Sequence, residues 1–384
     1  MTHKAEINEQ EGLFIRLNKH DVQSFIDLVQ RQFRSKSIIE YRYRFIKEKD
    51  FILIPLNHSS INDIRNYIET DCALKYEIVS RKVKKNPKFK YKTIEDLLKE
   101  ERPKWDNKLI PKSYDIIGSI AILEFPNLDN LSPKEKTLFK EDVAKAVTIV
   151  NKSVKSVYEK VSQVEGEYRL KKLQILFGDD NPETIHKENH TIFKLNVKKT
   201  YFTPRLVTER KRLSNSNISK GELIVDMFAG VGPFSIQIAK KRNVQIYSFD
   251  INVDAYNYLK ENVYLNNVEK RVFTFNINIK TLLDSESQQG NLLKGKIDRI
   301  IMNLPEKSLD FLDVACFLMK KSGGIIHNYQ FCSKPKPIEL GIEQFSHNLS
   351  KYHYQIEKVI HADIVKSYSP LMDLISLDVK VIAK

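Results

Sequence analysis

The chain has 384 residues, and its 63 lysines and arginines outnumber its 49 aspartates and glutamates, which gives a formal net charge of +14. This length exceeds that of an average domain, so we expect two or three domains. Three scattered cysteines (Cys72, Cys316 and Cys332) without a Cys-x-x-Cys pair argue against a disulfide scaffold or a metal site, and no run of about 18 uncharged apolar residues could span a membrane.

The N-terminal stretch, MTHKAEINEQEGLF, carries three glutamates and no apolar core. It is therefore neither a secretory signal nor a transit peptide, and we expect a cytoplasmic protein, with nuclear or mitochondrial pools as alternatives. After it, Asp21–Val29 predicts a short amphipathic helix, and Asp50–Pro55 predicts a buried strand that the proline stops. We expect an N-terminal domain over residues 1–90.

The segment Arg81–Lys92, RKVKKNPKFKYK, holds seven cations, two aromatic side chains and no anion. Together with the net charge, this clustering favours a polyanionic partner, most simply nucleic acid, and the rings suit stacking against bases. A solvated linker in a merely basic protein is the alternative.

A second, middle α+β domain is expected over residues 91–190. Ser132-Pro-Lys-Glu135 predicts the start of a helix, because Ser132 can cap it and Glu135 completes a capping box. Residues 169–177 and 191–197 read as strands.

From about residue 190, strands alternate with helices, which is typical of a doubly wound α/β sheet. We expect this domain to cover residues 191–384. Its expected strands are 223–228, 244–250, 272–277, 299–303 and 325–329, and its expected helices are 234–241, 255–267 and 309–320.

The first of these strands runs into a glycine turn, DMFAGVGPFS. Gly230 and Gly232 match the first half of a dinucleotide fingerprint, but Ser235 occupies its third glycine position. A P-loop would need Gly-Lys-Ser or Gly-Lys-Thr, which is missing. We expect the carboxylate of Asp226 at the mouth of the cleft, where it would repel a phosphate, so the turn favours a ligand without one.

Asp250, at the end of the next strand, can accept hydrogen bonds from ribose hydroxyls. The combination favours a nucleoside that bears an amine and no phosphate, and S-adenosylmethionine is such a molecule. The alternatives are a glycine turn used only for packing and an NAD enzyme.

Two other segments carry candidate chemistry. Asn303-Leu-Pro305 ends a strand where open α/β sheets bind substrate, and the Asn303 amide suits the edge of a base; an ordinary turn is the alternative. Glu209 lies among arginines in YFTPRLVTERKR. It is either a carboxylate at the cleft among phosphate-binding cations or a member of ion pairs within a surface helix.

These segments together resemble the tRNA (guanine(37)-N(1))-methyltransferases of archaea and eukaryotes. The resemblance covers residues 110–384, through the blocks IPKSYDIIGSIAILEF, EYRLKKLQILFGDD, YFTPRLVTERKRL, VDMFAGVGPFSIQIA, MNLPEKSLDFLD and VKSYSP. It implies an α/β fold with a Rossmann-like class I methyltransferase domain and smaller α+β N-terminal and middle domains. It also implies a monomer that uses S-adenosylmethionine and binds the anticodon loop and body of tRNA, the body through the N-terminal domain.

By this resemblance, Arg169 stabilises the transition state, Glu209 is the general base, and Asn303 completes the catalytic set. The candidate cofactor residues are Tyr201, Asp226, Phe228, Gly230, Gly232, Asp250, Asn278, Asn303 and Pro305. The candidate substrate residues are Arg205, Arg210, Lys366 and Tyr368. Asn278 departs from the family pattern, which has an aspartate near the adenine.

The chemistry explains why these groups are needed. Guanine N1 carries a proton that a base must remove, and negative charge then develops on O6, where a cation stabilises it. We therefore expect Glu209 and Arg169 to meet, which requires the middle domain to fold back onto the Rossmann-like cleft. A wybutosine-pathway aminocarboxypropyltransferase and a non-catalytic tRNA-binding protein remain the alternatives.

Overall fold

The structure is a computed structural model that describes residues 11–33, 38–71, 74–162 and 166–384. Cys72 and residues 1–10 lie outside the described residues. The contacts divide the chain into two compact units, residues 1–93 and 94–384. Within the described ranges, no helix has the length and apolar character that crossing a membrane requires.

The first unit is a four-stranded sheet in the order β2-β3-β1-β4 with two helices. Phe25, on the predicted first helix, packs with Ile15 and Ile54 in its core. The elements are β1 (Glu11–Asn18), α1 (Val22–Gln32), β2 (Ile46–Lys47), β3 (Phe51–Pro55), α2 (Ile61–Asp71) and β4 (Tyr76–Lys82).

The basic run 81–92 belongs to this unit. The Arg44 N–H donates to the Lys84 carbonyl at 2.8 Å, so the run is tied to the sheet beyond the end of β4. Phe89 and Tyr91 pack edge to face at 5.1 Å and are only partly exposed, so each ring already has an aromatic partner. The cations around them stay exposed.

The second unit begins with a four-stranded sheet, β5-β6-β7-β8, and two helices. The predicted capping box of Ser132 and Glu135 opens the longer helix. The strand expected over 169–177 starts only at Leu173, because Arg169 has a backbone φ of +56° that no strand adopts. The elements are α3 (Ile94–Glu101), β5 (Asp115–Ile117), β6 (Ile120–Leu123), α4 (Pro133–Val150), β7 (Ser156–Lys160) and β8 (Leu173–Phe177).

A two-stranded ribbon, β9 (Glu183–Glu188) and β10 (Thr191–Asn196), leads into the Rossmann-like sheet. The sheet has seven strands in the order β13-β12-β11-β14-β15-β17-β16, with parallel pairing from β13 to β15 and antiparallel pairing beyond. The strands are β11 (Leu223–Asp226), β12 (Gln245–Phe249), β13 (Val272–Phe275), β14 (Arg299–Met302), β15 (Gly324–Ser333), β16 (Tyr354–Ser367) and β17 (Met372–Ala383).

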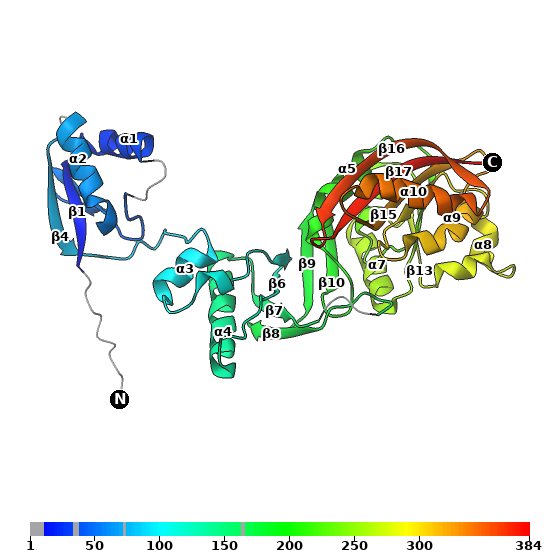
Figure 1. Cartoon of the computed structure of the whole chain (residues 1–384), viewed down its shortest axis with the longest axis horizontal. Helices are drawn as coiled ribbons and strands as arrows, with labels where there is room; N and C mark the ends of the chain where they lie inside the picture. Colours follow the sequence, from blue (N-terminus) through cyan, green and yellow to red (C-terminus); the bar gives the residue numbers. More distant parts are fainter. Residues whose placement is uncertain (1–10, 34–37, 72–73, 163–165) are drawn as a thin grey trace. The chain divides into compact units, whose positions relative to one another are not determined.

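Helices cover both faces of this sheet, which confirms the predicted fold class. One apolar core gathers α5 (Val207–Asn215), α6 (Pro233–Lys241) and α7 (Val253–Leu265), and the other gathers α8 (Gln288–Leu293), α9 (Leu312–Leu318) and α10 (Pro337–Ser350). The last helix lies along the long C-terminal strands, drawn in red in Figure 1. The helix expected over 309–320 is instead a short 3-10 turn, η5 (Ser308–Phe311), followed by α9.

Candidate active site

Two neighbouring cavities lie at the carboxyl ends of the parallel strands. The smaller has a volume of about 180 Å³ and follows β11, β12 and β13. The larger, of about 750 Å³, lies between the middle sheet and the Rossmann-like domain. Arg169, Tyr201 and Asn303 line both. These three side chains therefore form the common wall through which occupants of the two cavities would meet.

The glycine turn and Asp250 shape the smaller cavity. Gly230, at φ +55°, lines it, and a Cβ there would lie 3.8 Å from the Tyr201 carbonyl oxygen, an ordinary contact. Asp250 accepts the N–H groups of Gly230 at 2.7 Å and Asn252 at 2.9 Å. Burial raises the pKa of this carboxyl despite those hydrogen bonds. Each carboxylate oxygen retains a lone pair for a further donor, such as a ribose hydroxyl.

Aromatic and amide groups also line the smaller cavity. Phe228 and Phe311 meet edge to face at 4.9 Å, and Asn278 lies beside them, accepting the N–H of Lys280. The Lys280 ammonium is already 2.7 Å from the carboxylate of Asp313. The charge of Lys280, one of the described cations that line this cavity, is thus neutralised. The cavity therefore suits a nucleoside better than a pyrophosphate.

Three predicted cofactor residues do not line the smaller cavity. Asp226 is buried beneath the turn, where the Ser235 hydroxyl donates to it at 2.6 Å and burial raises its pKa to about 7. The expectation that it lies at the mouth of the cleft is therefore wrong. Gly232, at φ +89°, has a packing role, because a Cβ there would lie 2.5 Å from Leu259. Pro305 lines the larger cavity instead of the smaller one.

The larger cavity is rich in cations. The substrate candidates Arg205, Lys366 and Tyr368 line it. Four lysines that the sequence did not single out also line it: Lys108, Lys112, Lys160 and Lys171. Burial lowers the pKa values of Lys171 and Lys366, and neighbouring cations lower them further.

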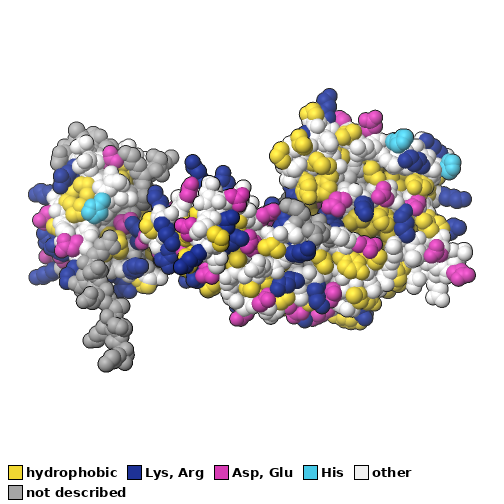
Figure 2. Space-filling view, turned by 60° about the horizontal axis from the view of Figure 1, so that its bottom comes forward, with side chains coloured by type: hydrophobic (Ala, Val, Ile, Leu, Met, Phe, Trp, Pro, Cys, Tyr) yellow, Lys and Arg dark blue, Asp and Glu magenta, His cyan; other side chains and the backbone are white. Residues whose placement is uncertain are grey.

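Only part of that positive charge is compensated. Asp115 accepts from Arg205 at 2.7 Å and lies 4.0 Å from Lys171, and Glu124 accepts from Lys160 at 2.9 Å. On the face of the molecule shown in Figure 2, lysines and arginines are interspersed with carboxylates. The concentration of cations in this cavity therefore favours an anionic occupant.

Arg169 has the features of an oxyanion donor. Its guanidinium lies over the Tyr201 ring at 5.0 Å, and its Nη2 is 3.3 Å from the carboxylate of Glu306. The Nε and Nη1 atoms are buried and have no hydrogen-bond partner among the described residues. Two buried N–H donors on the common wall can accept an oxygen that becomes negative.

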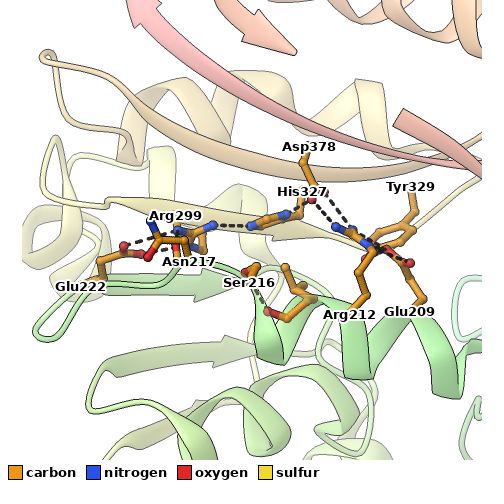
Figure 3. Close-up of polar contacts among 10 residues, drawn as sticks. Glu209, Arg212, Ser216, Asn217, Glu222, Arg299, His327, Tyr329 and Asp378 are labelled. Carbon is orange, nitrogen blue, oxygen red and sulfur yellow. Dashed lines mark hydrogen bonds and ion pairs between the residues drawn. The ribbon is translucent and has the colours of Figure 1, made fainter. Parts of the chain in front are cut away.

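Glu209 lies outside both cavities. Its carboxylate accepts from Arg212 at 2.5–3.0 Å and from the Tyr329 hydroxyl at 2.9 Å (Figure 3). The expectation that it meets Arg169 is wrong in this state of the protein, because Arg212, one helical turn along α5, holds the carboxylate in the interior.

The same ion pair continues across the sheet (Figure 3). Arg212 donates to Asp378 at 2.7 Å. His327, which lies opposite Asp378 on the neighbouring strand, places its Nδ1 2.7 Å from the same carboxylate. Arg299 can only donate, so the His327 Nε2 at 2.7 Å accepts and the ring is neutral. Burial lowers the pKa of His327, as a neutral ring requires.

The comparisons with known proteins agree with this geometry. Residues 184–357 match the TRM5/TYW2 methyltransferase domain, and residues 94–181 match the TYW2 N-terminal domain. The tRNA (guanine(37)-N(1))-methyltransferase Trm5b of Pyrococcus abyssi is 34% identical over 92% of this chain and 96% of its own length. The chain belongs to the TRM5/TYW2 methyltransferase family. The family resemblance drawn from the sequence is thereby confirmed.

Two further members of the TRM5/TYW2 family bear on the function. A solved complex of aTrm5 and tRNALeu has a TM-score of 0.72 at 28% identity, with 96% of this chain and 99% of that chain covered. The tRNA(Phe) (4-demethylwyosine(37)-C(7)) aminocarboxypropyltransferase of Pyrococcus horikoshii is 31% identical, but the match spans 75% of this chain against 96% of its own. The similarity to Trm5b therefore extends over more of the chain.

One candidate substrate residue of this TRM5/TYW2 family chain has a structural role. Arg210 is fully buried and donates to both oxygens of Glu188 at 2.5 and 2.6 Å and to the Thr203 carbonyl at 3.1 Å. The expectation that it binds substrate is wrong, because its guanidinium lines neither cavity and its charge is neutralised inside the domain.

Proposed function

We propose that this chain transfers the methyl group of S-adenosylmethionine to N1 of guanosine 37 in tRNA. The observation that carries the proposal is the pair of cavities that share Arg169, Tyr201 and Asn303. A nucleoside cofactor in the smaller cavity and an RNA base in the larger, cationic one would meet at that wall. The names of the relatives that match along nearly the whole chain support the same reaction.

The smaller cavity fits the cofactor by its donor set. Asp250 has lone pairs for the ribose hydroxyls, while Phe228, Phe311 and Asn278 offer faces and an amide to the adenine. S-adenosylmethionine supplies an electrophilic methyl group when it is bound there. No cation beyond Arg169 and the paired Lys280 lines the described wall, which suits a ligand that carries an amine and no phosphate.

Arg169 would act on the base. As N1 gains a methyl group and loses its proton, negative charge moves to O6, and the unpartnered Nε and Nη1 of Arg169 can donate to it. The Asn303 amide can hold the edge of the same base. Glu209 stays the predicted proton acceptor, and this role requires its carboxylate to separate from Arg212.

Aminocarboxypropyl transfer is the second candidate, because residues 94–181 match the TYW2 N-terminal domain. It would break a different bond to the same sulfonium and would alkylate carbon instead of N1. The relative named for this transfer acts on 4-demethylwyosine 37 instead of guanosine 37, so methyl label on a guanosine-37 transcript separates the two reactions.

The test is to incubate tRNA transcripts that carry guanosine 37 with S-adenosylmethionine labelled in its methyl group, or in its aminocarboxypropyl group. We expect methyl label in 1-methylguanosine after digestion and mass spectrometry, and no label with adenosine at position 37. Arg169→Met should lower the single-turnover rate by roughly two orders of magnitude. Aminocarboxypropyl label in the RNA, or no product at all, would overturn the proposal.

A further inference from the structure

Glu306 is presented to the common wall of the two cavities by a rigid turn. It follows Asn303-Leu-Pro305 at the carboxyl end of β14. The Lys307 N–H donates to the Leu304 carbonyl at 3.0 Å, and the Phe331 N–H of β15 donates to the Pro305 carbonyl at 3.2 Å. The backbone on either side of Glu306 is therefore held, and the turn that brings Asn303 to the cavities also directs this carboxylate.

The carboxylate ends beside Arg169. The Arg169 Nη2 lies 3.3 Å from Oε1 of Glu306, and the glutamate side chain keeps 46% of its surface exposed while that of the arginine keeps 13%. The Glu306 charge also acts on the phenol of Tyr201, whose pKa is raised first by burial and in part by this carboxylate. Glu306 thus interacts with two of the three side chains of the common wall: it forms an ion pair with Arg169 and acts electrostatically on Tyr201.

Arg169 needs such a restraint. A non-glycine residue at φ +56° occupies a sparsely populated backbone region, which persists only where the surrounding structure holds it. Its guanidinium otherwise rests on the Tyr201 ring, with Nε and Nη1 unpartnered among the described residues. The ion pair leaves these two nitrogens available to a substrate, since it uses only Nη2.

We propose that Glu306 is a positioning residue for the methyl transfer. It holds the guanidinium of Arg169 through Nη2, so that Nε and Nη1 face the oxygen of the base before the base arrives. The inference rests on the proposed function, because the charge on O6 is what Arg169 would stabilise. Glu306 accepts no proton and touches no reacting atom in this role.

The test compares single-turnover methylation of a guanosine-37 transcript by the full chain and by Glu306→Gln. The amide keeps the size of the side chain but loses the charge, so we expect a rate roughly ten- to a hundredfold lower. The Kd of S-adenosylmethionine, the KM for tRNA and the melting temperature should stay unchanged. Glu339→Gln, an exposed carboxylate in the first turn of α10, is the matched control and should behave like wild type.

A double-mutant cycle separates positioning from a general effect on the fold. In an Arg169→Met background, Glu306→Gln should cost nothing further, because the group that it positions is absent. An equal loss in both backgrounds, or a wild-type rate in Glu306→Gln, would overturn the positioning role. A wild-type chain that makes no 1-methylguanosine would instead count against the proposed function, so the two failures are distinguishable.

Discussion

The carboxylate of Glu209 is shared between Arg212 and the Tyr329 hydroxyl, and only 8% of the residue is exposed. If Glu209 accepts the N1 proton, this sharing must end when tRNA binds. We expect Glu209→Gln to lower the single-turnover rate by roughly two or more orders of magnitude, the usual scale for a positioned base. Cofactor affinity measured by calorimetry should stay constant, because Glu209 does not line the smaller cavity.

The same substitution has a second readout. Removing the Glu209 charge leaves Arg212 paired with Asp378 alone, so the protein should also lose stability. A melting temperature that falls while the chemical step stays near wild type would show that Glu209 serves the interior ion pair and not the reaction. A pH profile that rises and then levels off in wild type, and loses its rising limb in the variant, would identify the base.

The turn from β11 to α6 carries its own prediction through Asp226. Its folded-state pKa of about 7 lies above the value of about 4 expected in the unfolded chain. The folded state therefore binds this proton more tightly. The resulting stabilisation is complete below about pH 4 and is lost as the pH rises through about 7.

Asp226→Asn should remove this pH dependence, since an amide resembles the protonated acid and does not titrate. We expect urea unfolding between pH 5 and 8 to give a free energy of unfolding that falls less steeply in the variant than in wild type. Asp284→Asn, an exposed aspartate, is the matched control and should leave the slope unchanged. Parallel curves for wild type and Asp226→Asn would mean that the buried carboxyl titrates with an ordinary pKa.

At the level of elements, the sequence predicted those features whose signals come from residues close together in the chain. The capping box at Ser132, the proline stop of β3 and the alternation after residue 190 all rest on neighbours in sequence, and all appear in the structure. The β16–β17 hairpin was not predicted, because its pairing shifts register three times and hides the period of two. The backbone of Arg169, at φ +56°, likewise gives no signal in the residue type.

The candidate site shows the same division. Gly230 and Asp250 follow from a turn and a strand end, and they line the smaller cavity. The distant partners of Glu209 and Arg210 are Tyr329 and Glu188, which lie 120 and 22 residues away in the chain. Only the folded structure reveals such partners, because any nearby arginine could have neutralised those charges.

Across the whole molecule, positive charge occurs in two separate settings. The first unit carries exposed lysines in the basic run, among them Lys84, Lys85 and Lys88. The second unit holds Lys171 and Lys366 inside the larger cavity. If the N-terminal unit recognises the tRNA body, as the family resemblance implies, the first group should contribute affinity alone. The second group lies where the reacting base would enter, so it should contribute affinity and also orient the substrate.

Salt dependence of tRNA binding distinguishes these settings. Each lost phosphate contact should reduce the slope of log K against log salt by roughly 0.7–0.9, so replacing Lys84, Lys85 and Lys88 by Gln should flatten the dependence by up to about 2.7 units. The methylation rate at saturating tRNA should stay at the wild-type value.

Lys171→Met with Lys366→Met should flatten the slope and also slow methylation, because the cavity would no longer hold the RNA backbone beside the common wall. Cofactor affinity should be unchanged in both variants, since none of these lysines lines the smaller cavity. A slope equal to wild type in the first variant would remove the basic run from the tRNA interface, and an unchanged methylation rate in the second would limit the cavity lysines to a role in binding.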